Sequence, residues 1–232
     1  ADSSAGGALL FLGGATPDGT ADLTLTGGAA GDAFGSALAG LGDANGDGYA
    51  DFAVGAPGVN GDTGQVALFL GGVSTTSTAA VTYNGENFGH RFGAALAGAG
   101  DVNGDGYTDL AVAAPAYNAD TGRLYLFHGG AGGPDATADA IRTGAAAGAK
   151  FGAALDGAGD VDGDGYADLL AGAPGANSSA GQLSLYYGGA AGIGNSAPLP
   201  WNGGGGENFG AALAGNGDAN GDGFADFAAG GP

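Results

Sequence analysis

The sequence contains no cysteine, no methionine and only four lysine and arginine residues among its 232 positions. Without cysteine the chain can form neither disulfides nor thiolate metal sites. The basic residues face 24 acidic ones, and the formal charge of −20 argues against binding to nucleic acid or anionic lipid, which need a basic surface. No run of about 18 apolar residues occurs, so no membrane insertion is expected. The surplus carboxylates suggest cation binding or a halophile-like surface.

The chain opens at Ala1 without methionine and without a signal segment of charged and then apolar residues. Either Ala1 follows a cleavage or the chain is a piece of something longer. A mature secreted domain is the leading interpretation, and it predicts an extracellular or cell-surface location.

Glycine is abundant, with 56 residues, and together with 8 prolines it reaches a level typical of disordered chains when it is aperiodic. Here the glycines follow a repeat. Four segments run from a Phe-Gly pair to a proline, at 34–57, 92–115, 151–174 and 209–232. Their first aspartates are 58, 59 and 58 residues apart. An alternating apolar block follows the first three segments at 64–71, 122–129 and 181–188, and its fourth copy is at 7–13.

The sequence is therefore four circularly permuted repeats that start near 34, 92, 151 and 209, with the last one completed by 1–33. Each repeat reads as four short strands, exemplified by 37–39, 51–54, 66–70 and 21–26. We expect one all-β domain over 1–232, a β-propeller of four-stranded antiparallel blades. The N- and C-terminal segments are predicted to complete one blade and so to hide its edge strands. A β-solenoid or an open sandwich array is the alternative.

Nine-residue loops carry most of the chemistry, and 13 of the 24 acidic residues lie in them. Each loop has oxygen-bearing side chains at positions 1, 3, 5 and 9, and an aromatic residue whose backbone carbonyl is available at position 7. The predicted metal ligands are Asp43, Asn45, Asp47, Tyr49, Asp51; Asp101, Asn103, Asp105, Tyr107, Asp109; Asp160, Asp162, Asp164, Tyr166, Asp168; and Asp218, Asn220, Asp222, Phe224, Asp226.

Side chains at positions 1, 3 and 5 of a tightly coiled loop converge, and Ca²⁺ prefers six to eight oxygen ligands. The loop resembles the first half of an EF-hand, but position 12 holds Val54, Val112, Ala171 or Ala229, so the carboxylate at position 9 must close the site. Asn-Gly and Asp-Gly are also simple hairpin signals. A turn alone does not explain several carboxylates held together in four copies. We therefore expect four Ca²⁺ ions per chain; Mg²⁺, which keeps several waters, fits less well.

Phe-Gly, then the aspartate loop, then Gly-Ala-Pro resembles the FG-GAP repeat of integrin α-chain propellers and of related secreted bacterial and fungal proteins. The resemblance covers all four repeats, with Gly55-Ala56-Pro57 and Gly172-Ala173-Pro174 matching fully. It implies ions between the first two strands of each blade, on the face opposite the usual ligand-binding face. Integrin-like propellers have seven blades, whereas this chain has four repeats. It closes as four, pairs with a second chain to build eight, or belongs to a larger assembly.

An enzyme is not expected, because the two histidines, His90 and His128, lie in different repeats and no nucleophile triad or nucleotide motif occurs. The alternatives to an adhesion or protein-interaction domain are a structural subunit of a surface layer or filament, a glycan-binding lectin, and a polysaccharide lyase using Arg91, Tyr117 or Lys150. The partner is an unknown protein or glycan, and self-association is possible in principle. The loops opposite the aspartates hold the candidate contacts Asn60, Asn118, Asn177, Glu86, His90, Arg91, Lys150, Glu207 and Asn208. Tyr117 and Trp201, the latter on a presumed outer strand, are the aromatics expected to meet a partner or sugar, with packing between blades as the alternative for each.

Overall fold

A computed structural model describes residues 5–14, 19–74, 76–194 and 199–232, and within these the chain is almost entirely β-strand and turn. The strands are β1 (Gly7–Leu10), β2 (Leu23–Thr26), β3 (Ala37–Gly42), β4 (Asp51–Ala56), β5 (Gln65–Phe69), β6 (Val81–Asn84), β7 (Ala95–Gly100), β8 (Asp109–Ala114), β9 (Arg123–Phe127), β10 (Ala140–Thr143), β11 (Ala154–Gly159), β12 (Asp168–Ala173), β13 (Gln182–Tyr186), β14 (Leu199–Asn202), β15 (Ala212–Gly217) and β16 (Asp226–Gly230).

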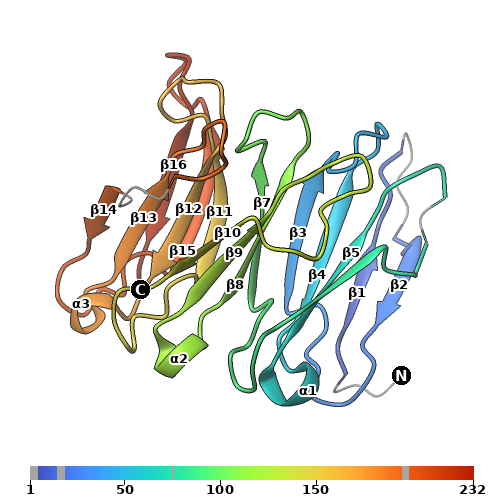
Figure 1. Cartoon of the computed structure of the whole chain (residues 1–232), viewed down its shortest axis with the longest axis horizontal. Coiled ribbons are helices and arrows are strands. Elements are labelled where there is room, and N and C mark those ends of the chain that lie inside the picture. Colours follow the sequence, from blue (N-terminus) through green and yellow to red (C-terminus); the bar gives the residue numbers. More distant parts are fainter. Residues whose placement is uncertain (1–4, 15–18, 75, 195–198) are drawn as a thin grey trace.

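Three sheets have four strands each, in the orders β3-β4-β5-β6, β7-β8-β9-β10 and β11-β12-β13-β14. Every strand pair is antiparallel, and each neighbour in a sheet is also the neighbour in sequence. The predicted all-β class with antiparallel four-stranded units is thereby confirmed. The sheets stand side by side in a row along the long axis of the molecule (Figure 1).

The first strand of each repeat is rich in alanine and glycine, and it packs directly on the first strand of the next repeat. A Cβ atom added to Gly98 of β7 would lie 2.5 Å from the carbonyl oxygen of Gly40 in β3. The same approach recurs between Gly157 and Gly98, at 2.6 Å, and between Gly215 and Gly157, at 2.0 Å. These backbones can touch only because glycine has no side chain at the point of contact.

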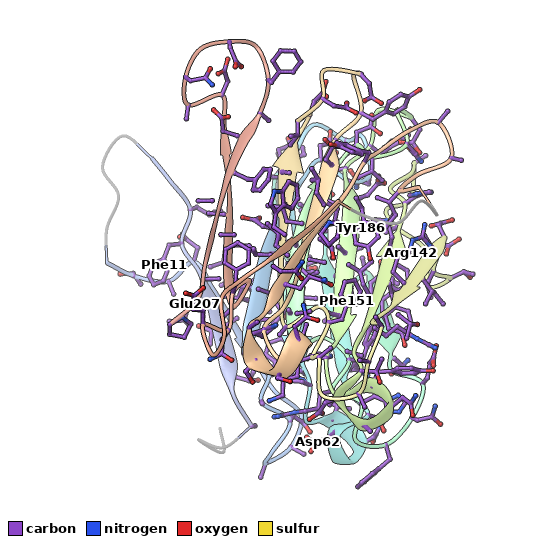
Figure 2. All side chains as sticks on the ribbon, turned by 90° about the vertical axis from the view of Figure 1, so that its left-hand side faces the viewer. Phe11, Asp62, Arg142, Phe151, Tyr186 and Glu207 are labelled. Atoms are coloured by element: carbon purple, nitrogen blue, oxygen red, sulfur yellow. The ribbon has the colours of Figure 1, made fainter. Side chains whose placement is uncertain are left out.

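The apolar core lies between adjacent sheets. One cluster joins Leu68 and Tyr83 of the β3–β6 sheet to Leu110 and Phe127 of the β7–β10 sheet. A second cluster includes Phe151 and Tyr186, whose rings are 6.2 Å apart and lie inside the molecule in Figure 2. Alternating apolar residues of the third strand, such as Leu124 and Leu126, are fully buried there. Burial of both faces explains why these strands carry so few polar residues.

The terminal segments differ from the sequence-based expectation. They were predicted to share one blade, but β1 and β2 form one two-stranded sheet while β15 and β16 form another. The two sheets sit at opposite ends of the row (Figure 1). Within the described residues the row is open, because no strand pairing joins β1 or β2 to β15 or β16. Within this chain the prediction of a shared terminal blade is wrong.

Three short helical turns connect the second and third strands of a repeat: α1 (Val59–Asp62), α2 (Tyr117–Asp120) and α3 (Ala176–Ser179). Their central residues have positive φ, for example 50° at Asn60, 45° at Asn118 and 52° at Asn177. Asparagine tolerates this left-handed conformation better than most residues. None of these turns extends beyond four residues.

Candidate metal centre

The four aspartate loops connect the first and second strands of each repeat and lie at one end of the sheets. The loops follow β3, β7, β11 and β15, and a register shift before each of them, as between Gly40 and Gly42, ends the regular pairing. The turns α1, α2 and α3 lie at the other end (Figure 1). The antiparallel order thus gathers the carboxylates on one face and the second set of loops on the opposite face.

The aspartate at position 1 organises each loop. In the first loop, Oδ1 of Asp43 accepts hydrogen bonds from the backbone N–H groups of Gly46 (2.7 Å) and Asp47 (3.0 Å), and its Oδ2 accepts one from Gly48 (2.8 Å). Asp101, Asp160 and Asp218 accept the same three bonds in their loops. These bonds lower the pKa of Asp218, with that from Gly223 contributing most. The position-1 carboxylate is therefore held inside a tight coil in each loop, and the lowered pKa favours the ionised form of Asp218.

Positions 3 and 5 lie beside each other within the coil. The side-chain amide of Asn45 donates to Asp47 at 2.9 Å, and the pairs Asn103–Asp105 and Asn220–Asp222 repeat this contact. Oδ1 of the position-5 aspartate also accepts from the backbone of the aromatic residue at position 7, at 2.9 Å for Tyr49. The predicted ligands at positions 1, 3 and 5 are thus all part of one hydrogen-bonded loop.

The aspartate at position 9 is the most buried of the set, because it begins the second strand. Asp51, Asp109 and Asp168 are at most 1% exposed. Each accepts one hydrogen bond from its own loop and one from the end of the third strand; for Asp109 the donors are Val102 (2.8 Å) and Gly129 (2.8 Å). Burial raises the pKa of Asp109 and of Asp168 to about 6 and raises that of Asp51 as well. This residue ties the loop to the sheet.

Carboxylates converge most closely in the third loop. Asp160, Asp162 and Asp168 each place an oxygen within 4.8 Å of the other two, the spacing expected of groups that share a cation. This loop has aspartate at position 3, where the other loops have asparagine. Its extra charge follows directly from the sequence, and it makes this loop the best candidate for a cation.

The aromatic residue at position 7 has a second role that the sequence did not reveal. The rings of Tyr107, Tyr166 and Phe224 each lie against the position-4 glycine of the preceding loop. A Cβ atom on Gly46, for example, would be 2.6 Å from Cε1 of Tyr107. Adjacent loops are therefore in contact. In the sequence, this contact could have been predicted from the aromatic residue at position 7 and the glycine at position 4 that recur in every loop.

The opposite face carries a polar cluster around Arg123, which sequence reasoning did not single out. The guanidinium lies over the ring of Tyr117, 3.6 Å from its centroid, and also donates to the Tyr117 hydroxyl. It donates as well to both carboxylate oxygens of Glu86, at 2.9 and 3.2 Å. The ring of His90 packs edge-on against Tyr117, with centroids 4.7 Å apart. Three of the candidate contact residues are therefore brought together across two repeats.

Other candidate contact residues are spread over this face and its surroundings. Arg91 faces Asp62 at 3.9 Å, and Asn177 donates to Asn202 at 2.7 Å. Trp201 packs against Phe227 with ring centroids 5.6 Å apart, which places its side chain between two sheets. Further candidates have positive φ values: Lys150 (54°) and Asn208 (47°). Glu207 accepts from the backbone of Gly204.

The raised pKa values predict how stability depends on pH in metal-free buffer. A carboxyl group whose folded pKa is about 6 holds a proton that the unfolded chain, at 3.8, has already released. The contribution of Asp109 and Asp168 to the free energy of unfolding is therefore largest below about pH 4, and it is lost as the pH rises through 6 and the two groups ionise. We expect a larger free energy of unfolding at pH 5 than at pH 7, by about 1.3 kcal/mol per group, because about one pKa unit of the difference is lost over this interval.

Urea denaturation at the two pH values, in buffer freed of divalent cations, measures this difference. Added Ca²⁺ should reverse its sign, because the cation competes with these protons. A metal-free chain that is less stable at pH 5 than at pH 7 would contradict the assignment.

Comparison with known proteins identifies the repeats. Residues 34–69, 92–127 and 151–186 match the FG-GAP repeat. The chain is 42% identical over 123 residues to integrin alpha-PS2 of Drosophila melanogaster, covering 48% of this chain and 9% of the relative. It is 38% identical over 130 residues to integrin alpha-V of Gallus gallus, covering 54% and 12%. Over 162 residues it is 36% identical to integrin alpha-10 of Homo sapiens, covering 66% and 14%.

These matches confirm the resemblance seen in the sequence: the chain is an integrin-like FG-GAP repeat protein. It spans between 9% and 16% of the length of such relatives. Among the residues described, no helix has the length and apolar character needed to cross a membrane.

Proposed function

We propose that the chain is an extracellular, non-enzymatic, Ca²⁺-binding domain whose four repeats are propeller blades and which serves in adhesion or protein interaction. The observation that carries the metal part is the repeated loop with oxygens at positions 1, 3, 5, 7 and 9, in which three carboxylates of the third copy converge. The adhesion part rests on the similarity to integrin α chains. The single-domain organisation over 1–232 belongs to the same proposal.

The residues present suit a hard divalent cation. The loops offer carboxylates, asparagine amides and backbone carbonyls, all oxygen donors, and the chain has no cysteine. Positions 1, 3 and 5 would hold the ion with the carbonyl at position 7. The buried position-9 aspartate, whose two oxygens already accept backbone bonds, would contribute through its remaining lone pairs and its charge. Bound Ca²⁺ would supply neutralisation of the clustered carboxylates.

The number of bound ions tests this proposal. After dialysis against Ca²⁺ and removal of free metal, elemental analysis of the chain should give four Ca²⁺ per molecule. The variant Asp47→Ala should give three, because it removes the position-5 carboxylate of one loop only; Asp105→Ala, Asp164→Ala and Asp222→Ala should do the same in the others. Asp135→Ala, which changes an exposed carboxylate outside the loops, is the control and should keep four. Equal counts in Asp47→Ala and parent would refute the assignment.

The partner-binding face is proposed to be the one opposite the aspartate loops, around Arg123, Tyr117 and Glu86. The cluster offers a planar cation stacked on an aromatic ring next to a carboxylate, which suits polar protein surfaces. Beads coated with the chain should adhere to immobilised extracellular matrix proteins, and Arg123→Ala should reduce the adhesion while leaving the ion count unchanged. Adhesion to immobilised glycans alone would favour the lectin alternative instead.

A further inference from the structure

The two end sheets of the row present the two halves of a contact that the chain already makes three times. In each internal contact, the first strand of one repeat packs against the first strand of the next repeat, as β3 packs against β7. Among the described residues, no further repeat packs on the outer side of the β15–β16 sheet. Likewise, no first and second strands of a repeat pair with β1 or pack on β3 from the other side. The chain thus carries complementary surfaces at its two ends.

Burial at equivalent positions shows that the first end is uncovered. Leu38 of β3 is 58% exposed, whereas Leu96, at the same position of the second repeat, is 8% exposed. Leu9 and Phe11 are 55% and 54% exposed, although the corresponding third-strand residues of the other repeats are buried. Figure 2 shows Phe11 at the outer edge of the molecule.

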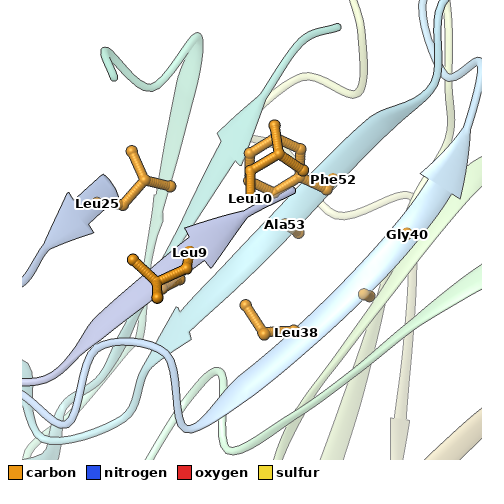
Figure 3. Close-up of a pocket in the computed structure, with 9 residues that line it drawn as sticks. Leu9, Leu10, Leu25, Leu38, Gly40, Phe52 and Ala53 are labelled. Carbon is orange, nitrogen blue, oxygen red and sulfur yellow. The ribbon is translucent and has the colours of Figure 1, made fainter. Parts of the chain in front are cut away.

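A groove of about 170 Å³ marks the place of the missing strands. It lies between β1 and the pair β3–β4 and is lined by leucines from both sides, including Leu9, Leu10 and Leu38 (Figure 3). In a complete repeat, the second strand lies beside the third strand, as β4 pairs with β5. The groove is the equivalent place beside β1, which is a third strand. The groove therefore has the position and the apolar lining that β16 of another repeat requires.

The surroundings of two glycine residues show that both ends of the row lack a neighbouring repeat among the described residues. The Cβ position of Gly40 has no atom within 4 Å, although those of Gly98, Gly157 and Gly215 meet the preceding repeat. At the other end, the Cβ position of Gly221 also has no atom within 4 Å. The Cβ positions of its counterparts Gly46, Gly104 and Gly163 each lie 2.6 Å from an atom of the aromatic ring in the next loop. Among the described residues, the internal positions have their neighbour, whereas Gly40 and Gly221 at the two ends lack it.

We propose that a second copy of this chain covers these surfaces, with β15–β16 of one copy docking between β1 and β3 of the other. Two copies related in this way form a closed ring of eight four-stranded units. A head-to-tail contact closes into a ring when the rotation per subunit allows it, and propellers have four to eight blades. Closure of one copy on itself would instead require changing all three internal glycine contacts.

The register of the new pairing follows from the internal repeats. Because Phe52 pairs with Phe69 and Ala53 with Leu68, Phe227 of one copy would pair with Phe11 of the other, and Ala228 with Leu10. Asp226 would gain a bond from the backbone of Gly13, as Asp51 accepts from Gly71 at 2.7 Å. Ala50 would donate to the carbonyl of Asp218, as Ala225 donates to Asp160 at 2.8 Å.

The mass of the particle in Ca²⁺, measured by size exclusion with light scattering over a range of concentrations, tests the proposal. The parent should have the mass of two chains. Gly40→Val should have the mass of one, because the added side chain meets open space in a single copy but the carbonyl of Gly215 in the ring. Gly132→Val is the matched control: its glycine is in an exposed loop of an internal repeat, also with nothing within 4 Å, and two chains should persist.

A mixing experiment establishes the head-to-tail direction. Ala228→Asp places a charge on the exposed β16 surface, at a position that is 0% exposed in Ala53 and Ala111. Alone it should also have the mass of one chain. A mixture of Gly40→Val and Ala228→Asp retains one intact pair of surfaces and should yield a two-chain species.

Three outcomes would overturn the proposal. A parent with the mass of one chain at every concentration would show that the ends stay free or close on each other. A two-chain mass that survives Gly40→Val would place the contact elsewhere, and open polymers would exclude the ring. Circular dichroism and the Ca²⁺ count of each variant are measured in the same samples, so that loss of folding or of cation binding is distinguished from loss of the contact.

Discussion

Removal of Ca²⁺ by a chelator should lower the midpoint of thermal unfolding by about 20 °C or more. A ligand that binds only the folded state stabilises it by about 2.7 kcal/mol per site at 100 times its dissociation constant. Four such loops together provide about 10 kcal/mol if they bind independently, and a chain of this size gains a few degrees for each kcal/mol. Circular dichroism melting curves in 1 mM Ca²⁺ and in excess chelator measure the shift.

The physical reason is the concentration of charge in the loops. Thirteen of the 24 acidic side chains lie in four nine-residue segments, and four lysine and arginine residues cannot neutralise them. In the described structure the position-1 aspartates are held by backbone N–H groups alone, which satisfies their hydrogen bonds but leaves their net charge. A cation removes this repulsion at its source.

Two controls separate binding from screening. Sodium chloride at high concentration screens exposed charges, so it should recover only a small part of the stability lost in chelator. Mg²⁺ should recover less than Ca²⁺ because it prefers to keep its waters. An unchanged midpoint in chelator would refute the calcium assignment, and full recovery with sodium chloride would reduce it to general charge screening.

The repeat made much of the fold predictable. Alternating apolar residues at 66–70 and their copies gave strands that the structure confirms as β5, β9 and β13. The aspartate loops also fall between the first and second strands, as expected. Period and alternation are local properties of a sequence, and antiparallel pairing of neighbouring strands needs little more.

The arrangement of the ends could not be read in the same way. The terminal segments add up to one repeat, which suggested a shared blade, but the angle between successive repeats decides whether the ends meet. That angle depends on how closely the backbones at Gly40, Gly98 and Gly157 approach, and glycine content alone does not specify it. The Arg123 cluster was missed for a related reason, because Glu86 is 37 residues away and comes from another repeat.

The glycine contact between repeats predicts the second large effect. Gly98→Val should lower the free energy of unfolding by about 3 kcal/mol or more, because its Cβ would lie 2.5 Å from the carbonyl oxygen of Gly40 and 3.2 Å from Cα of Leu41. These neighbours are backbone atoms in a paired strand, so they cannot rotate away as a flexible side chain could. Urea denaturation, in Ca²⁺ and at a concentration where single copies predominate, measures the change.

Gly40→Val is the matched control, since it makes the same substitution at the same position of the first repeat, where nothing lies within 4 Å. Its cost in a single copy should stay within about 0.5 kcal/mol, as for other exposed positions. Valine has high strand propensity, so the difference between the two variants isolates the contact between repeats from the preference of the strand itself. Equal losses would mean that glycine serves the strand rather than the contact. A loss confined to Gly98→Val would show that direct backbone packing holds successive repeats together, which is also the packing that a second copy would need at Gly40.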